Sequence, residues 1–179
     1  MESVKIKDKE FELFLTQQQI EKAIDDIAVK IASDLADSDP LFLCILNGSF
    51  MFASELMKRI NIPSELSFVK MSSYQGTKST GKLKELIGLQ EDIKGRTVVI
   101  VEDIVDTGHT MEMMLEQLES DNPKEIKVAA LLLKPDALKV EVPLDYIALE
   151  IPSDFIVGYG LDYDGYGRNL PNIYKLKQS

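Results

Sequence analysis

The residues of this chain best suited to chemistry lie in one short segment, 98–111, with the sequence Val-Val-Ile-Val-Glu-Asp-Ile-Val-Asp-Thr-Gly-His-Thr-Met. Its glycine lets the backbone approach an anion closely, and its threonines supply hydroxyl donors. Its Glu-Asp pair would repel a phosphate unless it binds ribose hydroxyls or reaches the anion through Mg²⁺. A sugar phosphate satisfies all of these groups together. The residues concerned are Glu102, Asp103, Thr107, Gly108 and Thr110.

The elements around this segment predict an α/β fold built on a parallel sheet with helices on both faces. Short apolar runs alternate with Gly-containing turns and amphipathic stretches, which is typical of such sheets. Ligands bind at the carboxyl ends of parallel strands, so the turns after Leu46, Glu102 and Leu133 should converge. The expected elements are a strand or arm within 1–15, a helix from Thr16 to before Pro40, strands at 41–46, 66–71, 98–101, 127–133, 146–149 and 155–159, and helices at 50–60 and 111–118.

The polar stretch 72–82 is rich in Gly, Ser and Thr. A loop of this length inside a compact fold is more often a lid or binding loop than an idle connection. We therefore expect the segment from Ser72 to about Gly88 to be mobile and to close over the site.

Composition limits the classes of partner. The 179 residues predict a single domain, and 30 acidic against 20 basic side chains give a net charge of −10. That charge argues against duplex nucleic acid as a partner. The longest apolar runs are too short for a membrane span and the start lacks a secretory pattern, so we expect no membrane partner and a cytoplasmic protein. The single cysteine, Cys44, is expected to be a core residue.

With these residues in view, the chain resembles the hypoxanthine-guanine phosphoribosyltransferases over nearly its whole length. The segment 98–111 is similar to the motif of type I phosphoribosyltransferases for phosphoribosyl pyrophosphate. Three further matches narrow the resemblance to the 6-oxopurine group, and Lys134 adds a fourth. These matches are Leu46-Asn-Gly-Ser49, the dipeptide Ser73-Tyr74, and Val157-Gly-Tyr-Gly-Leu-Asp-Tyr163 followed by Arg168.

The resemblance implies a type I phosphoribosyltransferase fold with a small hood from the chain ends. It also implies transfer of the 5-phosphoribosyl group from phosphoribosyl pyrophosphate to N9 of hypoxanthine or guanine. The products would be IMP or GMP and pyrophosphate, the cofactor Mg²⁺, and the assembly a homo-oligomer, either a dimer or a tetramer. In family members the peptide matching Leu46–Asn47 can be cis, which places an N–H on pyrophosphate.

Site roles follow from the same resemblance. Asp106 would act as general base or acid at N7 of the purine. Lys134 would bond O6, Phe155 would stack on the ring, and the backbone of Ile156 would read the 2-position. Asp162 would help to hold Mg²⁺ and Arg168 would contact pyrophosphate. Glu102 and Asp103 would hold the ribose hydroxyls, directly or through Mg²⁺. The 5-phosphate would be held by the loop Asp106, Thr107, Gly108, His109 and Thr110, into which Ile104 and Val105 lead. The other matching residues are Asn47 and Gly48 of the first turn and the dipeptide Ser73-Tyr74 that opens the long loop.

Two positions depart from the common family pattern. Asn47 stands where many members carry Lys or Arg, and His109 where many carry Lys. Each change removes a fixed positive charge near a phosphate. We therefore expect weaker fixed binding of pyrophosphate and a greater dependence on Mg²⁺.

Three alternatives compete with this interpretation. A non-catalytic regulator on the same fold could sense nucleotide or phosphoribosyl pyrophosphate, but such regulators usually add a nucleic-acid-binding domain or basic face. A dinucleotide-binding oxidoreductase would need a Gly-x-Gly-x-x-Gly after a strand, which this sequence lacks. Adenine-specific relatives lack an acid at the position of Asp106. Preference among hypoxanthine, guanine and xanthine stays open.

Overall fold

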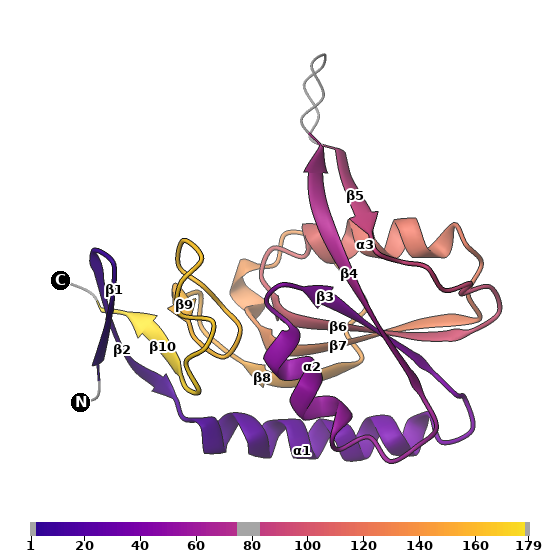
Figure 1. Ribbon diagram of the computed structural model, residues 1–179, viewed down its shortest axis with the longest axis horizontal. Coiled ribbons are helices and arrows are strands. Elements are labelled where there is room, and N and C mark those ends of the chain that lie inside the picture. The colour runs from indigo at the N-terminus through magenta and orange to yellow at the C-terminus, as the bar shows by residue number, and fades with distance from the viewer. Residues whose placement is uncertain (1–2, 75–82, 178–179) are drawn as a thin grey trace.

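The structure, a computed structural model, describes residues 3–74 and 83–177. Figure 1 shows a large sheet with helices on both sides and a small sheet beyond one end of it. The elements are β1 (Ser3–Ile6), β2 (Lys9–Leu15), α1 (Gln17–Asp34), β3 (Leu41–Leu46), α2 (Phe50–Met57), β4 (Glu65–Tyr74), β5 (Leu83–Ile87), β6 (Thr97–Val105), α3 (His109–Glu119), β7 (Glu125–Leu133), a short 3₁₀ helix (Pro135–Ala137), β8 (Tyr146–Glu150), β9 (Ile156–Val157) and β10 (Ile173–Leu176).

The large sheet has the strand order β5-β4-β3-β6-β7-β8. Strands β4, β3, β6, β7 and β8 run parallel, and β5 pairs antiparallel with β4. The predicted parallel sheet is confirmed, with β5 as an antiparallel edge that the sequence interpretation did not include. The carboxyl ends of β3, β6 and β7 meet at one edge, as expected for parallel neighbours.

The central strand β3 is apolar throughout because both of its faces are covered. Leu41, Leu43 and Ile45 point to the side that α3 covers, whereas Phe42 and Cys44 point to the side of α1 and α2. Figure 1 shows these helices on opposite faces of the sheet. Cys44 is fully buried and has no disulfide partner, and burial raises its pKa to about 12. The prediction that it is a core residue is confirmed.

Helix α1 begins where the sequence predicts. Thr16 is its N-cap, and a capping box joins the Thr16 and Gln19 side chains to each other's backbone N–H groups. Its apolar positions recur at helical spacing and are buried against the sheet. They are Ile20, Ala23, Ile24, Ile27, Ala28 and Ile31.

The small sheet, which we call the hood, has the order β1-β2-β10-β9 and is antiparallel. Its strands come from both ends of the chain, as the resemblance implied, although β10 was not among the predicted strands. A separate core of Ile6, Phe11, Val157 and Tyr174 holds it together. The hood is tied to the start of α1, because the Gln17 N–H donates to Asn172 Oδ1 at 2.7 Å.

The predicted loop after residue 71 is shorter than expected. Strand β4 continues through Tyr74, and β5 pairs with it in a register that sets Tyr74 opposite Leu83 and Lys70 opposite Ile87. The residues at this end of β4 are polar, so the sequence lacks the apolar run that predicts a strand. The strand continues there because β5 supplies hydrogen-bond partners for its backbone N–H and C=O groups. The centre of the predicted lid, residues 75–82, lies outside the described residues.

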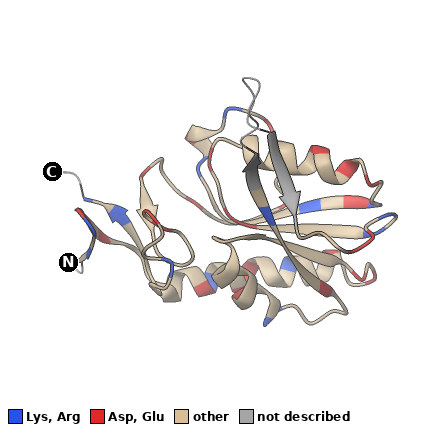
Figure 2. Cartoon of the chain, turned by 45° about the horizontal axis from the view of Figure 1, so that its top comes forward, with Lys and Arg blue, Asp and Glu red and all other residues tan. Residues whose placement is uncertain are grey.

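Charges of both signs are distributed over the helices and strand ends (Figure 2), in a chain that carries 30 acidic and 20 basic residues. No helix in the described part of the chain combines the length and the apolar character needed to cross a membrane. Binding a polyphosphate to so acidic a protein requires backbone N–H groups, metal or a few well-placed cations. The sheet edge at the carboxyl ends of β3, β6 and β7 supplies such groups.

Candidate active site

A cavity of about 360 Å³ lies at the edge where β3 and β6 end. The sequence predicts a strand only at 98–101, with Glu102 and Asp103 in the loop after it. Strand β6 instead extends to Val105, so both acidic residues belong to the strand. The lining combines the acidic strand end, the turn after it and an apolar wall. The lining residues are Ile45, Leu46, Gly48, Met71, Glu102, Asp103, Ile104, Val105, Asp106, Thr107, Gly108, Thr110 and Met111.

Two buried carboxyl groups form the acidic side of the cavity. Glu102 is 8% exposed and Asp103 is 9% exposed. Burial is the main cause that raises the pKa of Glu102 well above its ordinary value, and the hydrogen bond and charge of Asp103 raise it further. The Asp103 N–H donates to Glu102 Oε1 and the Ile104 N–H to Asp103 Oδ1, both at 3.1 Å. Hydroxyl donors or a cation would stabilise both groups in their charged form.

The turn after β3 packs tightly on this pair. The Leu46–Asn47 peptide is cis, as it can be in the resembling family. A Cβ atom on Gly48 would lie 1.8 Å from Asp103 Oδ2, so only glycine fits at this point. Ser49 is fully buried, and its hydroxyl donates to the Ile45 carbonyl at 2.6 Å. These contacts fix the backbone of the turn against the wall of the cavity.

The loop after β6 turns into α3 through Gly108. Gly108 has φ +87°, and a Cβ there would lie 2.9 Å from Val140 Cγ2, which excludes larger residues. The Thr107 carbonyl accepts from the Lys139 N–H at 3.0 Å, which anchors the loop from the far side. The helix α3 begins at His109, and Gly108 and Thr110 at its start line the cavity, a position suited to an anion because a helix N-terminus carries partial positive charge.

Asp106 and Lys134 form an ion pair, with Oδ2 and Nζ 3.0 Å apart. Lys134 follows β7 and is 8% exposed, whereas the Asp106 side chain is about half exposed on the cavity wall. The Lys134 N–H donates to the Val105 carbonyl at 3.0 Å, which aligns the two strand ends. The pair presents an ammonium donor and a carboxylate acceptor next to each other.

The hood supplies an aromatic group of its own. The Phe155 side chain is 46% exposed, with its ring edge-on to Tyr163 at 5.9 Å between centroids. Lys9 Nζ lies over both rings, 5.8 Å from Phe155 and 5.0 Å from Tyr163. Ile156 is buried, and its strand β9 pairs with β10.

Asp162 and Arg168 also pair, with Oδ1 and Nη2 2.7 Å apart. Arg168 Nη1 donates to the Gly160 carbonyl at 2.7 Å, and the Gly165 N–H donates to Asp162 Oδ2 at 2.7 Å. A Cβ on Gly160 would lie 2.0 Å from the Gly48 carbonyl oxygen. Gly160 therefore joins this ion pair to the turn that lines the cavity.

The structure thus places the predicted residues in two groups. Gly48, the run 102–108 and Thr110 line the cavity, Asn47 belongs to the same turn as Gly48, and Lys134 joins this group through its bond to Asp106. Phe155, Ile156, Asp162 and Arg168 lie in or beside the hood, outside the cavity lining. The backbone of Ser73 and Tyr74 forms the end of β4, and His109 is exposed with Nδ1 3.5 Å from Glu112 Oε2.

Sequence reasoning missed two features of the site. The apolar wall of Ile45, Leu46, Met71 and Met111 carries no chemical signal of its own. Gly160 was only part of a quoted motif, although its φ of +99° and its contact with Gly48 make it the link between the two groups. A Gly-Tyr-Gly sequence before a predicted site aspartate was the available signal.

The two buried carboxylates suit Mg²⁺ that is bound together with substrate. Among the described residues the structure brings together no group of three or more His, Cys, Asp or Glu side chains able to hold a metal ion. Mg²⁺ usually takes one or two protein carboxylates and completes its coordination with water and substrate phosphates. Glu102 and Asp103, buried on the cavity wall, fit that donor set.

Comparisons with known proteins agree with this geometry. Residues 12–164 match the model of the phosphoribosyl transferase domain. The hypoxanthine-guanine phosphoribosyltransferase of Dictyostelium discoideum is 40% identical over 172 residues, covering 93% of this chain and 96% of that protein. That of Streptococcus thermophilus (strain CNRZ 1066) is 36% identical over 167 residues and 93% of each chain.

A solved structure is equally similar. The crystal structure of a hypoxanthine phosphoribosyltransferase from Staphylococcus aureus matches with a TM-score of 0.85 at 35% identity, covering 93% of this chain and 91% of that one. These relatives favour an enzyme over a regulator on the same fold. The chain belongs to the hypoxanthine-guanine phosphoribosyltransferase family of purine salvage enzymes.

Proposed function

We propose that this enzyme transfers the 5-phosphoribosyl group of phosphoribosyl pyrophosphate to N9 of hypoxanthine or guanine, giving IMP or GMP and pyrophosphate. The observation that carries the proposal is the Asp106–Lys134 pair, 3.0 Å apart, beside a cavity that is also lined by the turn of Thr107 and Gly108 into α3. A 6-oxopurine and a sugar phosphate bound side by side would use both features.

The sugar phosphate is assigned to the cavity. Backbone N–H groups at the start of α3, with the hydroxyls of Thr107 and Thr110, would hold the 5-phosphate. Glu102 and Asp103 would accept hydrogen bonds from the ribose hydroxyls, which offsets the cost of their charged forms in a buried site. The groups lie on consecutive parts of one strand and turn, so they hold the ribose in a fixed orientation.

The purine is assigned to the ion pair of Asp106 and Lys134. The Lys134 ammonium would donate to O6, and the Asp106 carboxylate would face N7. As N9 forms its bond to the anomeric carbon and the bond to pyrophosphate breaks, Asp106 would take or return the N7 proton. Phe155 would stack on the ring, and the backbone of Ile156 would read the 2-position edge.

Pyrophosphate leaves with its electron pair while positive charge builds on the ribose, as in glycoside cleavage. Glu102 and Asp103 would hold Mg²⁺ at the ribose, and Asp162 would help to hold Mg²⁺ on the pyrophosphate; the bound metal would supply positive charge to the leaving group. The turn at Asn47 and Gly48 would offer backbone N–H groups. Arg168 has five N–H donors, so its two contacts leave donors available for phosphate oxygens.

The test is a steady-state comparison of hypoxanthine, guanine and xanthine with phosphoribosyl pyrophosphate, with Mg²⁺ and with a chelator. Because Asn47 and His109 leave the phosphate side short of fixed cations, we expect no measurable turnover in chelator and recovery on adding Mg²⁺. Turnover without metal would contradict this account of pyrophosphate departure. Binding of phosphoribosyl pyrophosphate without turnover of any of the three bases would contradict the proposed reaction.

A further inference from the structure

Tyr159 is a buried residue for which the proposed mechanism has no use. Its side chain is 1% exposed and packs in the core between the large sheet, α1 and α2. Its hydroxyl is buried and has no hydrogen-bond partner among the described residues. A buried hydroxyl without a partner costs free energy that a phenylalanine would not cost. The hydroxyl is therefore expected to have a partner in another state of the protein.

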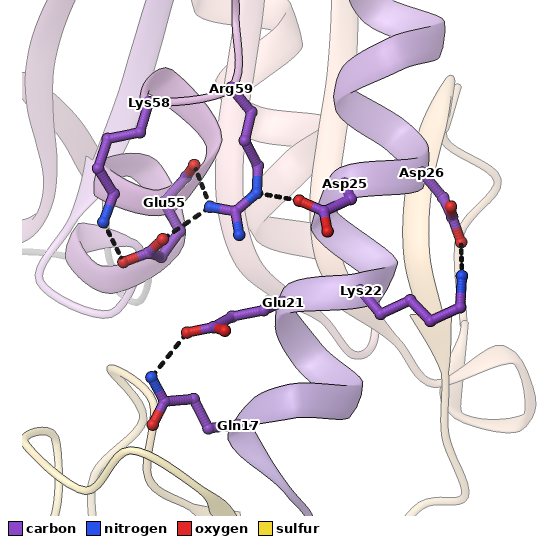
Figure 3. A network of polar contacts seen from close by, with 8 residues as sticks. All are labelled: Gln17, Glu21, Lys22, Asp25, Asp26, Glu55, Lys58 and Arg59. Carbon is purple, nitrogen blue, oxygen red and sulfur yellow. Dashed lines mark hydrogen bonds and ion pairs between the residues drawn. The ribbon is translucent and has the colours of Figure 1, made fainter.

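Tyr159 shares its core cluster with residues of α1 and α2, and these helices carry the carboxylates of Glu21 and Glu55. Burial raises the pKa of Tyr159, and the negative charges of Glu55 and then Glu21 raise it further, against the opposing charge of Arg59. Figure 3 shows Glu55 and Arg59 joined to Asp25 of α1, and Glu21 joined separately to Gln17. Glu55 accepts from Lys58 Nζ at 2.5 Å and from Arg59 Nη1 at 2.7 Å, and Glu21 accepts from Gln17 Nε2 at 2.6 Å.

The backbone of Tyr159 leads directly to the candidate pyrophosphate site. Tyr159 has φ +51° and stands between two glycines, of which Gly160 contacts the carbonyl of Gly48. The Gly160 carbonyl accepts from Arg168, and the Gly160 N–H donates to the Arg168 carbonyl at 2.9 Å. A ligand that moves Arg168 or the turn at Gly48 therefore shifts the backbone that carries Tyr159.

We propose that Tyr159 is a positioning residue of the pyrophosphate side, and that its hydroxyl donates to Glu55 when pyrophosphate is bound. Glu55 is preferred to Glu21 because it lies on α2, the helix that begins directly after the turn at Asn47 and Gly48. The turn proposed to contact pyrophosphate and the proposed acceptor, Glu55, then belong to one continuous segment of the chain. The inference rests on the proposed assignment of this turn and Arg168 to pyrophosphate.

The central experiment compares the parent with Tyr159→Phe by calorimetric titration of Mg²⁺-pyrophosphate, by thermal unfolding and by steady-state kinetics. Because one hydrogen bond is lost only in the bound state, affinity for pyrophosphate should fall by roughly 3- to 10-fold. The KM for phosphoribosyl pyrophosphate should rise in parallel, while the KM for the base stays unchanged. The Tm of the free protein should be unchanged or higher, since its hydroxyl has no bond to lose.

Tyr146→Phe is the matched control. Tyr146 is 3% exposed, and its hydroxyl donates to Asp34 Oδ2 at 3.2 Å, away from the cavity. Its loss should lower Tm and leave pyrophosphate affinity unchanged. If Tyr159→Phe instead lowered Tm as this control does, or bound pyrophosphate as the parent does, the positioning role would be wrong.

A double-mutant cycle identifies the acceptor. The effects of Tyr159→Phe and Glu55→Gln on the free energy of pyrophosphate binding should be non-additive. The effects of Tyr159→Phe and Glu21→Gln on the same quantity should be additive. Additivity with Glu55 would overturn the proposed bond. Failure of the parent to bind pyrophosphate would overturn the proposed function itself, an outcome distinct from equal binding by parent and variant.

Discussion

The two groups of site residues are built in different ways. On the cavity side, Glu102 to Thr110 are one uninterrupted stretch in which a buried strand passes through a glycine turn into a helix. On the hood side, Phe155 and Ile156 are held by a sheet whose strands come from both ends of the chain. The first group is fixed by the register of a parallel sheet, and the second depends on pairings between residues more than 100 positions apart.

This difference suggests a division of labour. The cavity residues lie at the ends of neighbouring strands that are anchored in the closely packed core, so their positions are rigid. A rigid site suits a charged sugar phosphate that must be held in one orientation. The hood has a small core of its own and presents an exposed ring, which suits an aromatic base that enters and leaves. Substitutions in one group should therefore alter different kinetic constants from those in the other.

The largest effect is expected at Asp106, in the cavity group. Asp106→Asn keeps the shape of the side chain but cannot exchange a proton, so kcat should fall by roughly 10²- to 10⁴-fold. Binding of phosphoribosyl pyrophosphate should persist, because backbone groups and threonines hold the 5-phosphate. Single-turnover rates measured beside calorimetry on the Mg²⁺ complex would show the separation.

If Asp106→Asn had a kcat close to that of the parent, Asp106 would not be the general base. If substrate binding and kcat fell together, Asp106 would have a structural role in the loop after β6 rather than a role in proton transfer. The ion pair with Lys134 gives that second outcome a structural basis, so stability must be measured in the same variant.

The next effect concerns the hood alone. Phe155→Ala removes a stacking surface for the base, a change of about 1–3 kcal/mol, so the KM for the base should rise roughly 5- to 150-fold. The KM for phosphoribosyl pyrophosphate should stay within about twofold if the groups act separately. Tyr166→Ala is a control, since Tyr166 is another exposed hood aromatic and should leave both constants unchanged. Equal rises in both KM values would contradict the division.

A smaller effect is expected where Gly160 joins the two groups. Gly160→Ala places a methyl group 2.0 Å from the Gly48 carbonyl, so the turn must shift and pyrophosphate affinity should fall roughly tenfold. Gly95→Ala is the matched control, because Gly95 also has a positive φ, +70°, but a Cβ there meets nothing within 4 Å. It should cost about 1–2 kcal/mol of stability without altering affinity. An equal loss of affinity in both variants would show that strain alone was responsible.

The same contrast explains what the sequence could predict. Strand β3 and the start of α1 were predicted to the residue because an apolar run and a capping threonine are local signals. The cavity residues followed for the same reason, since they lie in one motif. Strand β6 proved longer than its apolar run, because pairing with β7 continues through Glu102 to Val105.

The features that were missed depend on distant partners. Strands β5 and β10 exist because β4 and β2 offer edges to them, and neither has a strong local pattern. The contact between Gly160 and Gly48 spans more than 100 residues, and no spacing rule reveals it. Phe155, Ile156, Asp162 and Arg168 could be named by resemblance, but their separation from the cavity lining could not.

The smallest effect on activity is expected at Thr16, which caps α1 at the junction between hood and sheet. Its hydroxyl accepts from the Gln19 N–H at 3.3 Å, and the Thr16 N–H donates to Gln19 Oε1 at 2.9 Å. Thr16→Ala should lower the free energy of unfolding by about 1 kcal/mol, or roughly 2–4 °C in Tm. Ser54→Ala, at an exposed position inside α2, is the control and should not destabilise, because alanine favours helix interiors. Both variants should keep the parent KM values, since neither residue touches the cavity. If Thr16→Ala raised the KM for the base while Ser54→Ala did not, the cap would be orienting the hood, and the two groups would be coupled through α1 rather than independent.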